Sequence, residues 1–339
     1  MTNFDNIQIL KQEKIPVESL LSTKIKLEKV NGDIGISNEI VLKNLYRPQL
    51  ALAGYIELFS NRSIQIFGNT EVYYLKSLSK ERRIESFNNL SKFDIPCIIL
   101  TNNHDLEPEV LEITNKHNIA VLKTPFDTTT TTYMLTEFLD DQFAPQAVVH
   151  GSFVDVYGVG VLFMGRSGIG KSEVALDLVE RGHRLVADDV VMLTKKKETI
   201  LMGTGTNVVQ HFMEIRGLGI IDVRQMFGIR SIRYQKRLEI IVELKEFDPN
   251  EDYTRIGLDE EPRKVMGVDI STVQLPIFPG KNITVIAEVI AIHYLLRTYG
   301  YNAAKIFSEK LQDEIKRKSD PNSPFKYKRS VPYIQPDEE

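Results

Sequence analysis

Short apolar runs and amphipathic stretches alternate along the first 130 residues of the chain. Apolar runs of four to six residues are typical of buried strands, and apolar positions repeating every three or four residues are typical of helices. Strands are expected at 24–28, 63–67, 96–101 and 119–123, and helices at 79–93 and 107–117. This order predicts a small parallel sheet built from βαβ units. The stretch shows no catalytic pattern, so Arg47 and His104 are expected in surface or capping roles.

The pattern changes at a run of five threonines, 128–132. Threonine is a poor residue for a helix interior and competes well for turns and caps, so the run predicts the linker region and the entry to the next helix. After it, a helix is expected at 133–139, strands at 147–156, 159–164, 184–193 and 238–244, and helices at 283–299 and 303–315. The helix at 283–299 is apolar on all sides, which predicts that it is buried.

The fold class predicted from these elements is α/β, with two domains and a tail. The N-terminal domain spans 1–130, the C-terminal domain 131–318, and a mobile tail 319–339. A chain of 339 residues is long enough for about two domains.

Composition narrows the classes of partner and compartment. The net charge of −4 gives no bulk attraction to nucleic acid or to an anionic membrane. No apolar run approaches the ~18 residues of a membrane helix, and the N-terminus lacks the apolar core of a signal peptide. The single cysteine, Cys97, lies in an apolar run and is expected to be a buried small hydrophobe. We therefore expect a cytoplasmic protein with no nucleic-acid or membrane partner.

One motif predicts phosphate binding. The pattern G-x-x-x-x-G-K-[ST] is met by Gly165, Arg166, Ser167, Gly168, Ile169, Gly170, Lys171 and Ser172. A strand is expected before it and a helix after it, which is the setting that this motif needs. Its glycines let backbone N–H groups face phosphate oxygens, and the helix N-terminus adds the positive end of its dipole. Lys171 is expected to reach the outer phosphates and the Ser172 hydroxyl to hold Mg²⁺.

Two adjacent carboxylates, Asp188 and Asp189, interrupt the apolar run that follows. Neighbours on a strand point to opposite faces, so the two are expected to do different work. One is suited to Mg²⁺ and the other to a general base, whose pKa the apolar neighbours would raise. A strand end with two solvated charges is the alternative.

Four further residues have two interpretations each. Glu173 suits either the helix dipole or a nearby Mg²⁺. A lone histidine in a strand, such as His150, is more often a packed core residue than a site residue. Glu214 and Arg216, beside Gly217, suit either a bound phosphate or metal, or a structural ion pair.

Together these segments resemble the bacterial HPr kinase/phosphorylase family in residue type and spacing. The matching segments are 150–151, 165–173, 186–189, 213–223, 255–259 and 276–282. They span about residues 147 to 300, whereas the N-terminal half resembles the family only in length and βαβ order.

The resemblance implies a bifunctional enzyme that regulates carbon catabolite repression and sugar uptake. Its kinase activity would move a phosphoryl group from ATP or pyrophosphate, with Mg²⁺, to a serine of the phosphocarrier protein HPr. Its phosphorylase activity would attack that phosphoserine with inorganic phosphate and release pyrophosphate. The family implies a P-loop domain whose nucleotide site resembles that of phosphoenolpyruvate carboxykinase, assembly as a homohexamer, and an N-terminal domain for assembly or regulation.

The resemblance also implies roles for individual residues. The loop from Gly165 to Lys171 would bind phosphate, and Asp188 would exchange the proton of the acceptor serine. Mg²⁺ would be held, directly or through water, by Ser172, Glu173, Asp189 and Glu214. The remaining implied site residues are His150, Arg216, Gly217, Arg255, Pro276, Ile277, Pro279, Gly280 and Lys281. Position 278 is Phe where many members have Arg, so the balance of the two activities is less defined than the kinase itself.

Three other classes use similar residues. A small-molecule kinase would need a pocket for its acceptor, and a nucleotide-binding switch would not need the Asp188–Asp189 pair. The guanine-specifying pattern Asn-Lys-x-Asp is absent from the sequence. Phosphoenolpyruvate carboxykinase itself is a much larger enzyme than this C-terminal domain allows.

Overall fold

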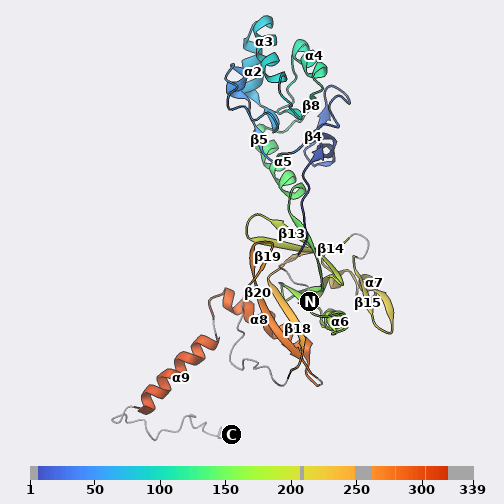
Figure 1. Ribbon diagram of the computed structural model, residues 1–339, viewed down its shortest axis with the longest axis vertical. Helices are drawn as coiled ribbons and strands as arrows, with labels where there is room; N and C mark the ends of the chain where they lie inside the picture. Colours follow the sequence, from blue (N-terminus) through green and yellow to red (C-terminus); the bar gives the residue numbers. More distant parts are fainter. Residues whose placement is uncertain (1–6, 207–209, 249–261, 279, 302, 320–339) are drawn as a thin grey trace, which may run out of the picture. The chain divides into compact units, whose positions relative to one another are not determined.

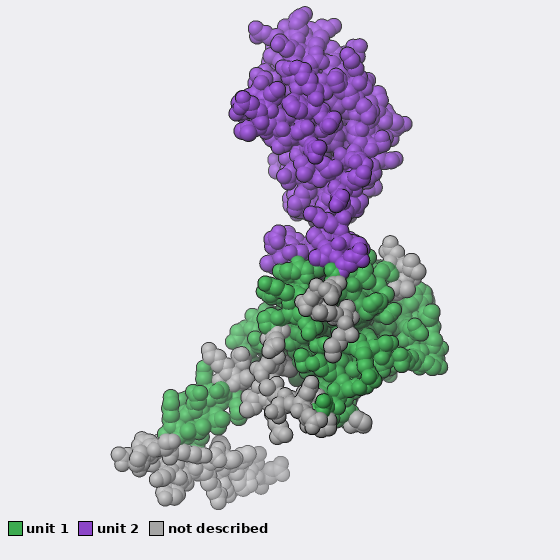
Figure 2. Space-filling model, in the orientation of Figure 1, with its two compact units in different colours: residues 1–7, 148–193, 202–339 green, residues 8–147, 194–201 purple. Residues whose placement is uncertain are grey.

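The computed structural model describes residues 7–206, 210–248, 262–278, 280–301 and 303–319 (Figure 1). The expected tail after Ser319 lies outside the described residues. The chain divides into two compact units (Figure 2). The N-terminal unit comprises 8–147 and 194–201, and the C-terminal unit comprises 1–7, 148–193 and 202–339.

A five-stranded sheet with the order β3-β8-β7-β6-β5 forms the centre of the N-terminal unit. Strands β5 to β8 run parallel to one another, and β3 pairs antiparallel with β8. The bounds are β3 (Glu28–Lys29), β5 (Leu45–Tyr46), α1 (Gln49–Leu52), β6 (Ile64–Phe67), α2 (Asn69–Ser77), α3 (Lys80–Ser91), β7 (Cys97–Leu100), α4 (Pro108–Lys116), β8 (Ala120–Lys123) and α5 (Thr128–Gln142). A small antiparallel pair is formed by β2 (Ile15–Pro16) and β4 (Glu39–Ile40), which lie before and after β3 along the chain. The βαβ order expected from the sequence is therefore confirmed.

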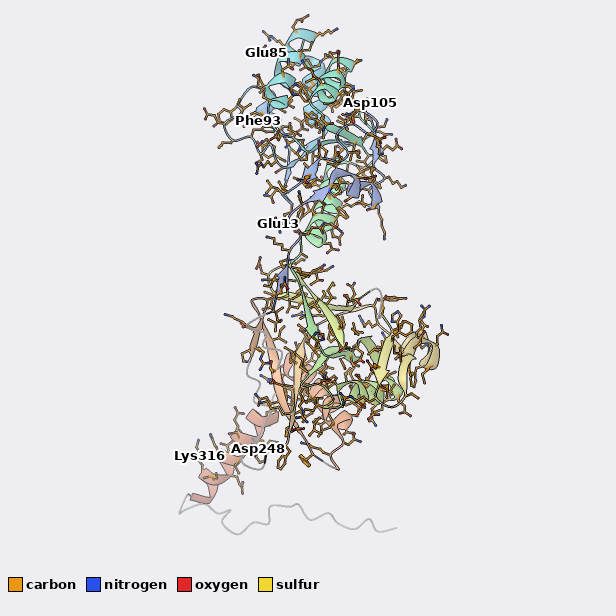
Figure 3. All side chains as sticks on the ribbon, turned by 45° about the vertical axis from the view of Figure 1, so that its right-hand side comes forward. Glu13, Glu85, Phe93, Asp105, Asp248 and Lys316 are labelled. Carbon is orange, nitrogen blue, oxygen red and sulfur yellow. The ribbon has the colours of Figure 1, made fainter. Side chains whose placement is uncertain are left out.

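Helices cover both faces of this sheet, because successive strand residues point to opposite sides. Ile64 and Ile66 of β6 share a buried cluster with Leu135 of α5. Phe67 packs on the other face, in a cluster formed with α2, α3 and α4. Charged side chains such as Glu85 of α3 lie on the outside of the unit (Figure 3). Alternation along short strands thus produces a three-layer α/β/α arrangement.

The threonine run opens helix α5 and is not a linker, so the expected boundary at residue 130 falls inside a helix. Asp127 is the N-cap, and its Oδ1 accepts the Thr130 backbone N–H at 2.9 Å. A good N-cap stabilises a helix by about 1 kcal/mol, which offsets the low propensity of threonine. Leu135 and Leu139 then bury the helix against the sheet.

The strand expected at 24–28 is also wrong, because pairing begins only at Glu28 in β3. Lys26 has a φ of +54°, outside the extended region that a strand requires. Ile25 is buried nonetheless, so its apolar character reflects the core and not a strand. Cys97 is buried in β7, and burial raises the pKa of its thiol well above the ordinary range, as expected for an inert hydrophobe.

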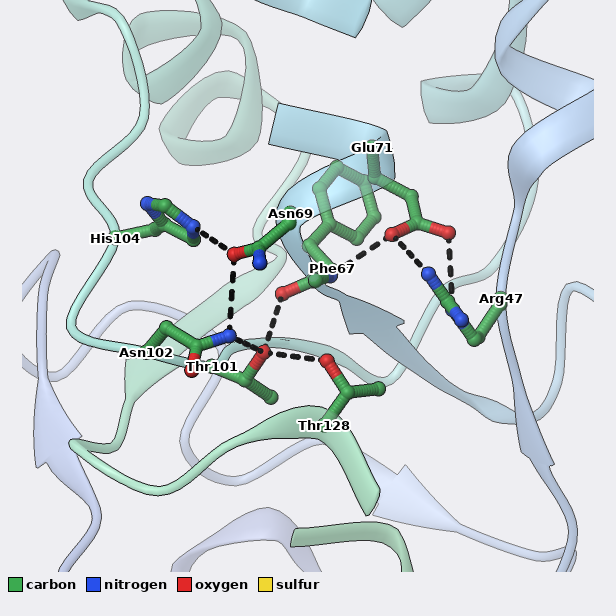
Figure 4. Close-up of polar contacts among 9 residues, drawn as sticks. Arg47, Phe67, Asn69, Glu71, Thr101, Asn102, His104 and Thr128 are labelled. Atoms are coloured by element: carbon green, nitrogen blue, oxygen red, sulfur yellow. Dashed lines mark hydrogen bonds and ion pairs between the residues drawn. The ribbon is translucent and has the colours of Figure 1, made fainter. Parts of the chain in front are cut away.

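Polar side chains connect the carboxyl ends of β5, β6 and β7 (Figure 4). Arg47 donates to both carboxylate oxygens of Glu71, at 3.0 and 2.9 Å. Glu71 is buried and also accepts the Gly68 backbone N–H at 2.9 Å, at the start of α2. His104 Nε2 lies 2.7 Å from Asn69 Oδ1. Arg47 and His104 therefore belong to one polar network around the start of α2, in keeping with the surface or capping roles expected of them.

The C-terminal unit is built on a six-stranded sheet with the order β12-β10-β11-β18-β20-β19. Strands β11, β18 and β20 run parallel, and the other pairs are antiparallel. Helices α6 and α8 bury Leu178 and Ala287 in one cluster with Val161 and Val242 of the sheet. The bounds are β10 (Ser152–Val156), β11 (Val159–Met164), α6 (Lys171–Glu180), β12 (Arg184–Ala187), β18 (Ile240–Glu246), β19 (Arg263–Val265), β20 (Val268–Ile277) and α8 (Ile283–Thr298).

The remaining elements described form a second sheet, a hairpin, two further helices and two short 3-10 turns. The sheet has the order β1-β9-β13-β14-β17, and the hairpin pairs β15 with β16. Their bounds are β1 (Ile9–Leu10), β9 (Gln146–His150), β13 (Val190–Lys196), β14 (Ile200–Gly205), β15 (Phe212–Ile215), β16 (Gly219–Asp222), α7 (Val223–Phe227), β17 (Gln235–Arg237) and α9 (Ala303–Ser319), with short 3-10 turns at Val17–Ser22 and Ile229–Ser231. None of the helices in the described part of the chain is both long and apolar enough to cross a membrane.

Helix α8 is only half buried, contrary to the expectation from its composition. Ala287 and Ile290 are in the core, whereas Val289 and Leu296 are exposed. The apolar character of all its faces therefore exceeds what the core of this chain requires.

An ionic network, in which Glu288 and His183 are buried and Arg181 is exposed, fixes the end of α6 to α8. Glu288 of α8 accepts from Arg181 Nε at 2.9 Å and from Arg181 Nη2 at 2.6 Å, and its Oε1 lies 3.0 Å from His183 Nε2. The Arg181 hydrogen bonds lower the pKa of Glu288 to about 2. Thr284 donates to Asp177 at 3.2 Å, nearer the middle of α6. These contacts fix the C-terminal part of α6, the helix that begins at Lys171.

Candidate functional site

The phosphate-binding motif forms the connection between β11 and α6. Gly165 has a φ of +149°, and a Cβ there would lie 2.7 Å from the Leu244 carbonyl oxygen, so the position requires glycine. Lys171 begins α6, and its Nζ donates to the carbonyl oxygens of Gly165 and Arg166 at 3.3 and 3.2 Å. The lysine side chain thus folds back over the loop.

Residues from two neighbouring elements contact the loop. Arg216, in the turn after β15, donates from Nη2 to Ser167 Oγ at 3.4 Å. Gly168 has a φ of +83°, and a Cβ there would lie 2.5 Å from Arg216 Nη1. On another side, Arg166 forms an ion pair with Glu246, the last residue of β18. Arg216 therefore contacts the loop at Ser167 and Gly168.

Asp188 and Asp189 lie where the chain leaves β12 in one sheet and enters β13 in the other. Asp189 has a φ of +62°, and the Val190 backbone N–H donates to the Asp188 carbonyl at 2.7 Å. Asp188 is 4% exposed, whereas the Asp189 side chain is 77% exposed. The two carboxylates do have different surroundings, but a sharp turn produces the difference and not strand alternation.

Two hydroxyl groups hold the buried carboxylate of Asp188. Its Oδ1 accepts from Ser152 Oγ at 2.5 Å and from Ser172 Oγ at 3.1 Å. Its Oδ2 is buried and has no hydrogen-bond partner within the described part of the chain. Burial raises the pKa of Asp188, and the two serine hydrogen bonds oppose that effect. A carboxylate with one free oxygen and a raised pKa is suited to accepting and returning a proton.

His150 is the last residue of β9, and its side chain is 66% exposed. Its Nδ1 lies 3.9 Å from Asp189 Oδ1, so the interpretation as a packed core histidine is wrong. Glu173, in the first turn of α6, and Glu214, on β15, have exposed side chains. Over the ranges that the structure describes, no three His, Cys, Asp or Glu side chains gather closely enough to hold a metal ion.

The donors around the loop nevertheless fit Mg²⁺. This ion prefers oxygen ligands, keeps several waters, and binds through one or two carboxylates together with substrate phosphates. Ser172 offers a hydroxyl oxygen at the start of α6, and the exposed carboxylate of Asp189 follows Asp188, which accepts from that hydroxyl. A protein cage of three acidic residues is therefore not required.

The segment expected to affect phosphorolysis begins at the end of β20. Ile277 pairs with Glu246 of β18, which forms the ion pair with Arg166 of the phosphate loop. Beyond it, Lys281 Nζ lies 4.8 Å above the Phe278 ring. The other segment members described are Pro276, in β20, and Gly280, which has a φ of +86°. Pro279 and Arg255 lie outside the described residues.

Sequence reasoning missed Ser152 and Glu246. Ser152 belongs to a strand in which all five residues are buried, so no alternation distinguishes its polar side chain. Glu246 ends a strand whose pattern gives no sign that its carboxylate meets Arg166. Both contacts depend on the order of strands in the sheet, which the sequence pattern does not predict.

A phosphate loop follows a parallel strand, and a buried carboxylate accepts a hydrogen bond from the serine of that loop. These features define a two-domain α/β protein of the phosphoryl-transfer class. Family models give a more specific assignment. The model for the HPr Serine kinase N terminus matches residues 15–139, and that for the HPr Serine kinase C-terminal domain matches residues 141–311.

Two similar proteins bear the same family name. The HPr kinase/phosphorylase of Chloroherpeton thalassium is 52% identical over 313 residues, which cover 92% of each chain. That of Prosthecochloris aestuarii is 51% identical over 299 residues, or 88% of each chain. A solved structure of the Hpr(Ser) kinase/phosphatase from Coxiella burnetii is 29% identical and covers 47% of this chain and 97% of its own, with a TM-score of 0.43.

The chain belongs to the HPr kinase/phosphorylase family. The resemblance inferred from the motifs and the expected class of enzyme are thereby confirmed. Membership also disfavours the three rival classes, since the relatives are named as enzymes that combine a kinase with a phosphorylase.

Proposed function

We propose that this chain transfers the γ-phosphoryl group of ATP, or a phosphoryl group of pyrophosphate, to a serine of HPr and also removes it with inorganic phosphate. The observation that best supports this is Asp188, buried, bonded to Ser172 of the phosphate loop, and left with one free oxygen. A protein that only bound nucleotide would gain nothing from burying such a carboxylate, which costs free energy.

The proton and the phosphoryl group move in a balanced exchange. In the kinase direction, Asp188 Oδ2 takes the proton of the acceptor hydroxyl while the serine oxygen bonds to phosphorus. The bond from phosphorus to the leaving group breaks, and that group is ADP when ATP is the donor and inorganic phosphate when pyrophosphate is the donor. In the reverse direction, an oxygen of inorganic phosphate bonds to the phosphorus of phosphoserine. The serine oxygen then leaves with the proton from Asp188, and the product is pyrophosphate. Both directions need the same carboxylate, in opposite protonation states.

The other residues position the reactants and balance their charge. Lys171 and the loop from Gly165 would hold the phosphates, with Arg216 behind Ser167. Mg²⁺ would be held by Ser172 and Asp189, and by Glu173 and Glu214 through water; when bound, it neutralises phosphate charge. His150, beside Asp189, would lie next to the reacting phosphate. Arg255 and the segment from Pro276 to Lys281 would act mainly in phosphorolysis.

Positioning and charge neutralisation account for most catalysis of phosphoryl transfer, so this set of residues is sufficient. We further propose that the chain acts as a homohexamer in the cytoplasm and that the N-terminal unit serves assembly or regulation. The mass of the purified protein by light scattering tests the assembly.

The direct test uses the purified chain, Mg-ATP and HPr, with phosphoserine followed by mass spectrometry. We expect phosphate on one HPr serine, at least a hundredfold less with Lys171→Ala, and no change with Lys92→Ala, an exposed lysine of the N-terminal unit. The proposal fails if ATP binds but HPr stays unmodified, or if Lys171→Ala transfers phosphate at the normal rate.

A further inference from the structure

Ser152 stands directly opposite the buried carboxylate. It is the first residue of β10 and is fully buried. The next residue, Phe153, pairs with Ala187 at the end of β12, and Asp188 follows Ala187. The antiparallel register therefore brings Ser152 and Asp188 face to face, and the hydroxyl and carboxylate meet at 2.5 Å.

Both hydroxyls that contact Asp188 bind the same oxygen. Ser152 and Ser172 donate to Oδ1, and Oδ2 is buried without a partner. A hydrogen bond to a carboxylate is stronger and more directional than one between neutral groups. Two of them on one oxygen fix the rotation of the carboxylate and leave the other oxygen to accept a proton.

The two serines differ in the elements that hold them. Ser172 belongs to the phosphate-binding motif, where its hydroxyl is expected to serve Mg²⁺ as well. Ser152 lies outside the motif, on a strand that pairs on both sides, with β11 and with β12. Side chains on paired strands are held more precisely than those on loops. The shorter of the two contacts is also the one from this strand.

We propose that Ser152 is a positioning residue for the transfer reaction, holding Oδ1 of Asp188 so that Oδ2 faces the acceptor hydroxyl. This inference rests on the proposed function, because it assumes that Asp188 exchanges the proton. Ser152 does not touch either substrate in this role. Its removal should therefore slow the chemical step without weakening the binding of ATP or HPr.

The test compares Ser152→Ala and Ser152→Thr with the unmodified chain. Losing a hydrogen bond to a charged group should lower kcat about tenfold or more, with both KM values within about twofold. Threonine keeps the hydroxyl and should restore most of kcat. Ser86→Ala is the matched control, since Ser86 is buried and donates at 2.5 Å to the Leu52 carbonyl in the N-terminal unit. We expect that variant to keep normal kinetics.

A double variant separates positioning from general damage. If Ser152 acts through Asp188, adding Ser152→Ala to Asp188→Asn should lower the residual rate by less than about twofold. Thermal unfolding and ATP affinity show whether each variant is folded. If the unmodified chain transfers phosphate, the inference is overturned by a kcat within about twofold for Ser152→Ala. A tenfold further loss in the Asp188→Asn background would equally overturn it. If the unmodified chain transfers nothing to HPr, the proposed function fails instead.

Discussion

Replacing Glu288 with glutamine should destabilise the C-terminal unit in a manner that depends on pH. Glu288 is buried in α8 and is held by both Arg181 and His183, next to the end of α6. Glutamine keeps the shape of the side chain but removes its charge. The variant therefore isolates what the ionised carboxylate contributes.

The magnitude follows from the pKa of Glu288, which falls from 4.5 to about 2 because of its hydrogen bonds to Arg181. Each pKa unit corresponds to about 1.4 kcal/mol, so the ionised carboxylate contributes about 3 kcal/mol to the free energy of unfolding. Because the pKa is lower in the folded state, the contribution is complete above about pH 4.5. It disappears as the pH falls towards 2, and about half of it remains at pH 3.

Urea unfolding of both proteins at neutral pH and at pH 3 measures this difference. We expect a gap of about 3 kcal/mol at neutral pH that shrinks by about half at pH 3. Glu85→Gln, on the exposed side of α3, is the control and should give no gap at either pH. A gap that stayed constant between the two pH values would show that the ionic contacts of Glu288 do not stabilise the fold.

Three further outcomes are expected. Gly168→Ala should weaken ATP binding about tenfold in calorimetry, because the added Cβ meets Arg216. Gly54 has a similar positive φ but open space around it, so the control variant Gly54→Ala should bind ATP normally. Burial raises the pKa of Asp188, so the kinase should lose activity on acidification at a pH above the ordinary pKa range of aspartate. Phosphorolysis needs the protonated form of Asp188, so it should be favoured at that pH. If kinase and phosphorolysis share one pH profile, Asp188 does not exchange the proton. Phe278→Arg should raise the ratio of phosphorolysis to kinase, because a guanidinium offers inorganic phosphate charged donors; an unchanged ratio would exclude this position from the balance.

Local chemistry in the sequence predicted the phosphate loop and the order of elements. The glycines, the lysine and the flanking apolar runs specify strand, loop and helix within a few residues, as β11 and α6 confirm. The parallel sheet of the N-terminal unit follows from the same regularity. The prediction from the threonine run failed because helix propensity was not the deciding factor there. The N-cap Asp127 and the buried leucines stabilise α5 by more than the threonines destabilise it.

The surroundings of Asp188 could not be predicted in the same way. Its partners, Ser152 and Ser172, are 36 and 16 residues away along the chain. Ser152 meets it because β10 pairs with β12, and Ser172 meets it because α6 packs against these two strands. The left-handed turn at Asp189 likewise depends on the passage between two sheets. The pairing of strands and the turns between sheets are properties of the whole fold. A motif therefore predicts which residues act, whereas the structure shows which contacts position them.

The central claim is that one site performs both transfer and its reversal through Asp188. The most direct measurement gives the purified chain phosphoserine-HPr and isotopically labelled inorganic phosphate, and follows the label. We predict labelled pyrophosphate in step with unmodified HPr, and loss of both this reaction and the kinase in Asp188→Asn. Release of unlabelled phosphate by water, or an Asp188→Asn variant that keeps either reaction at its normal rate, would contradict it.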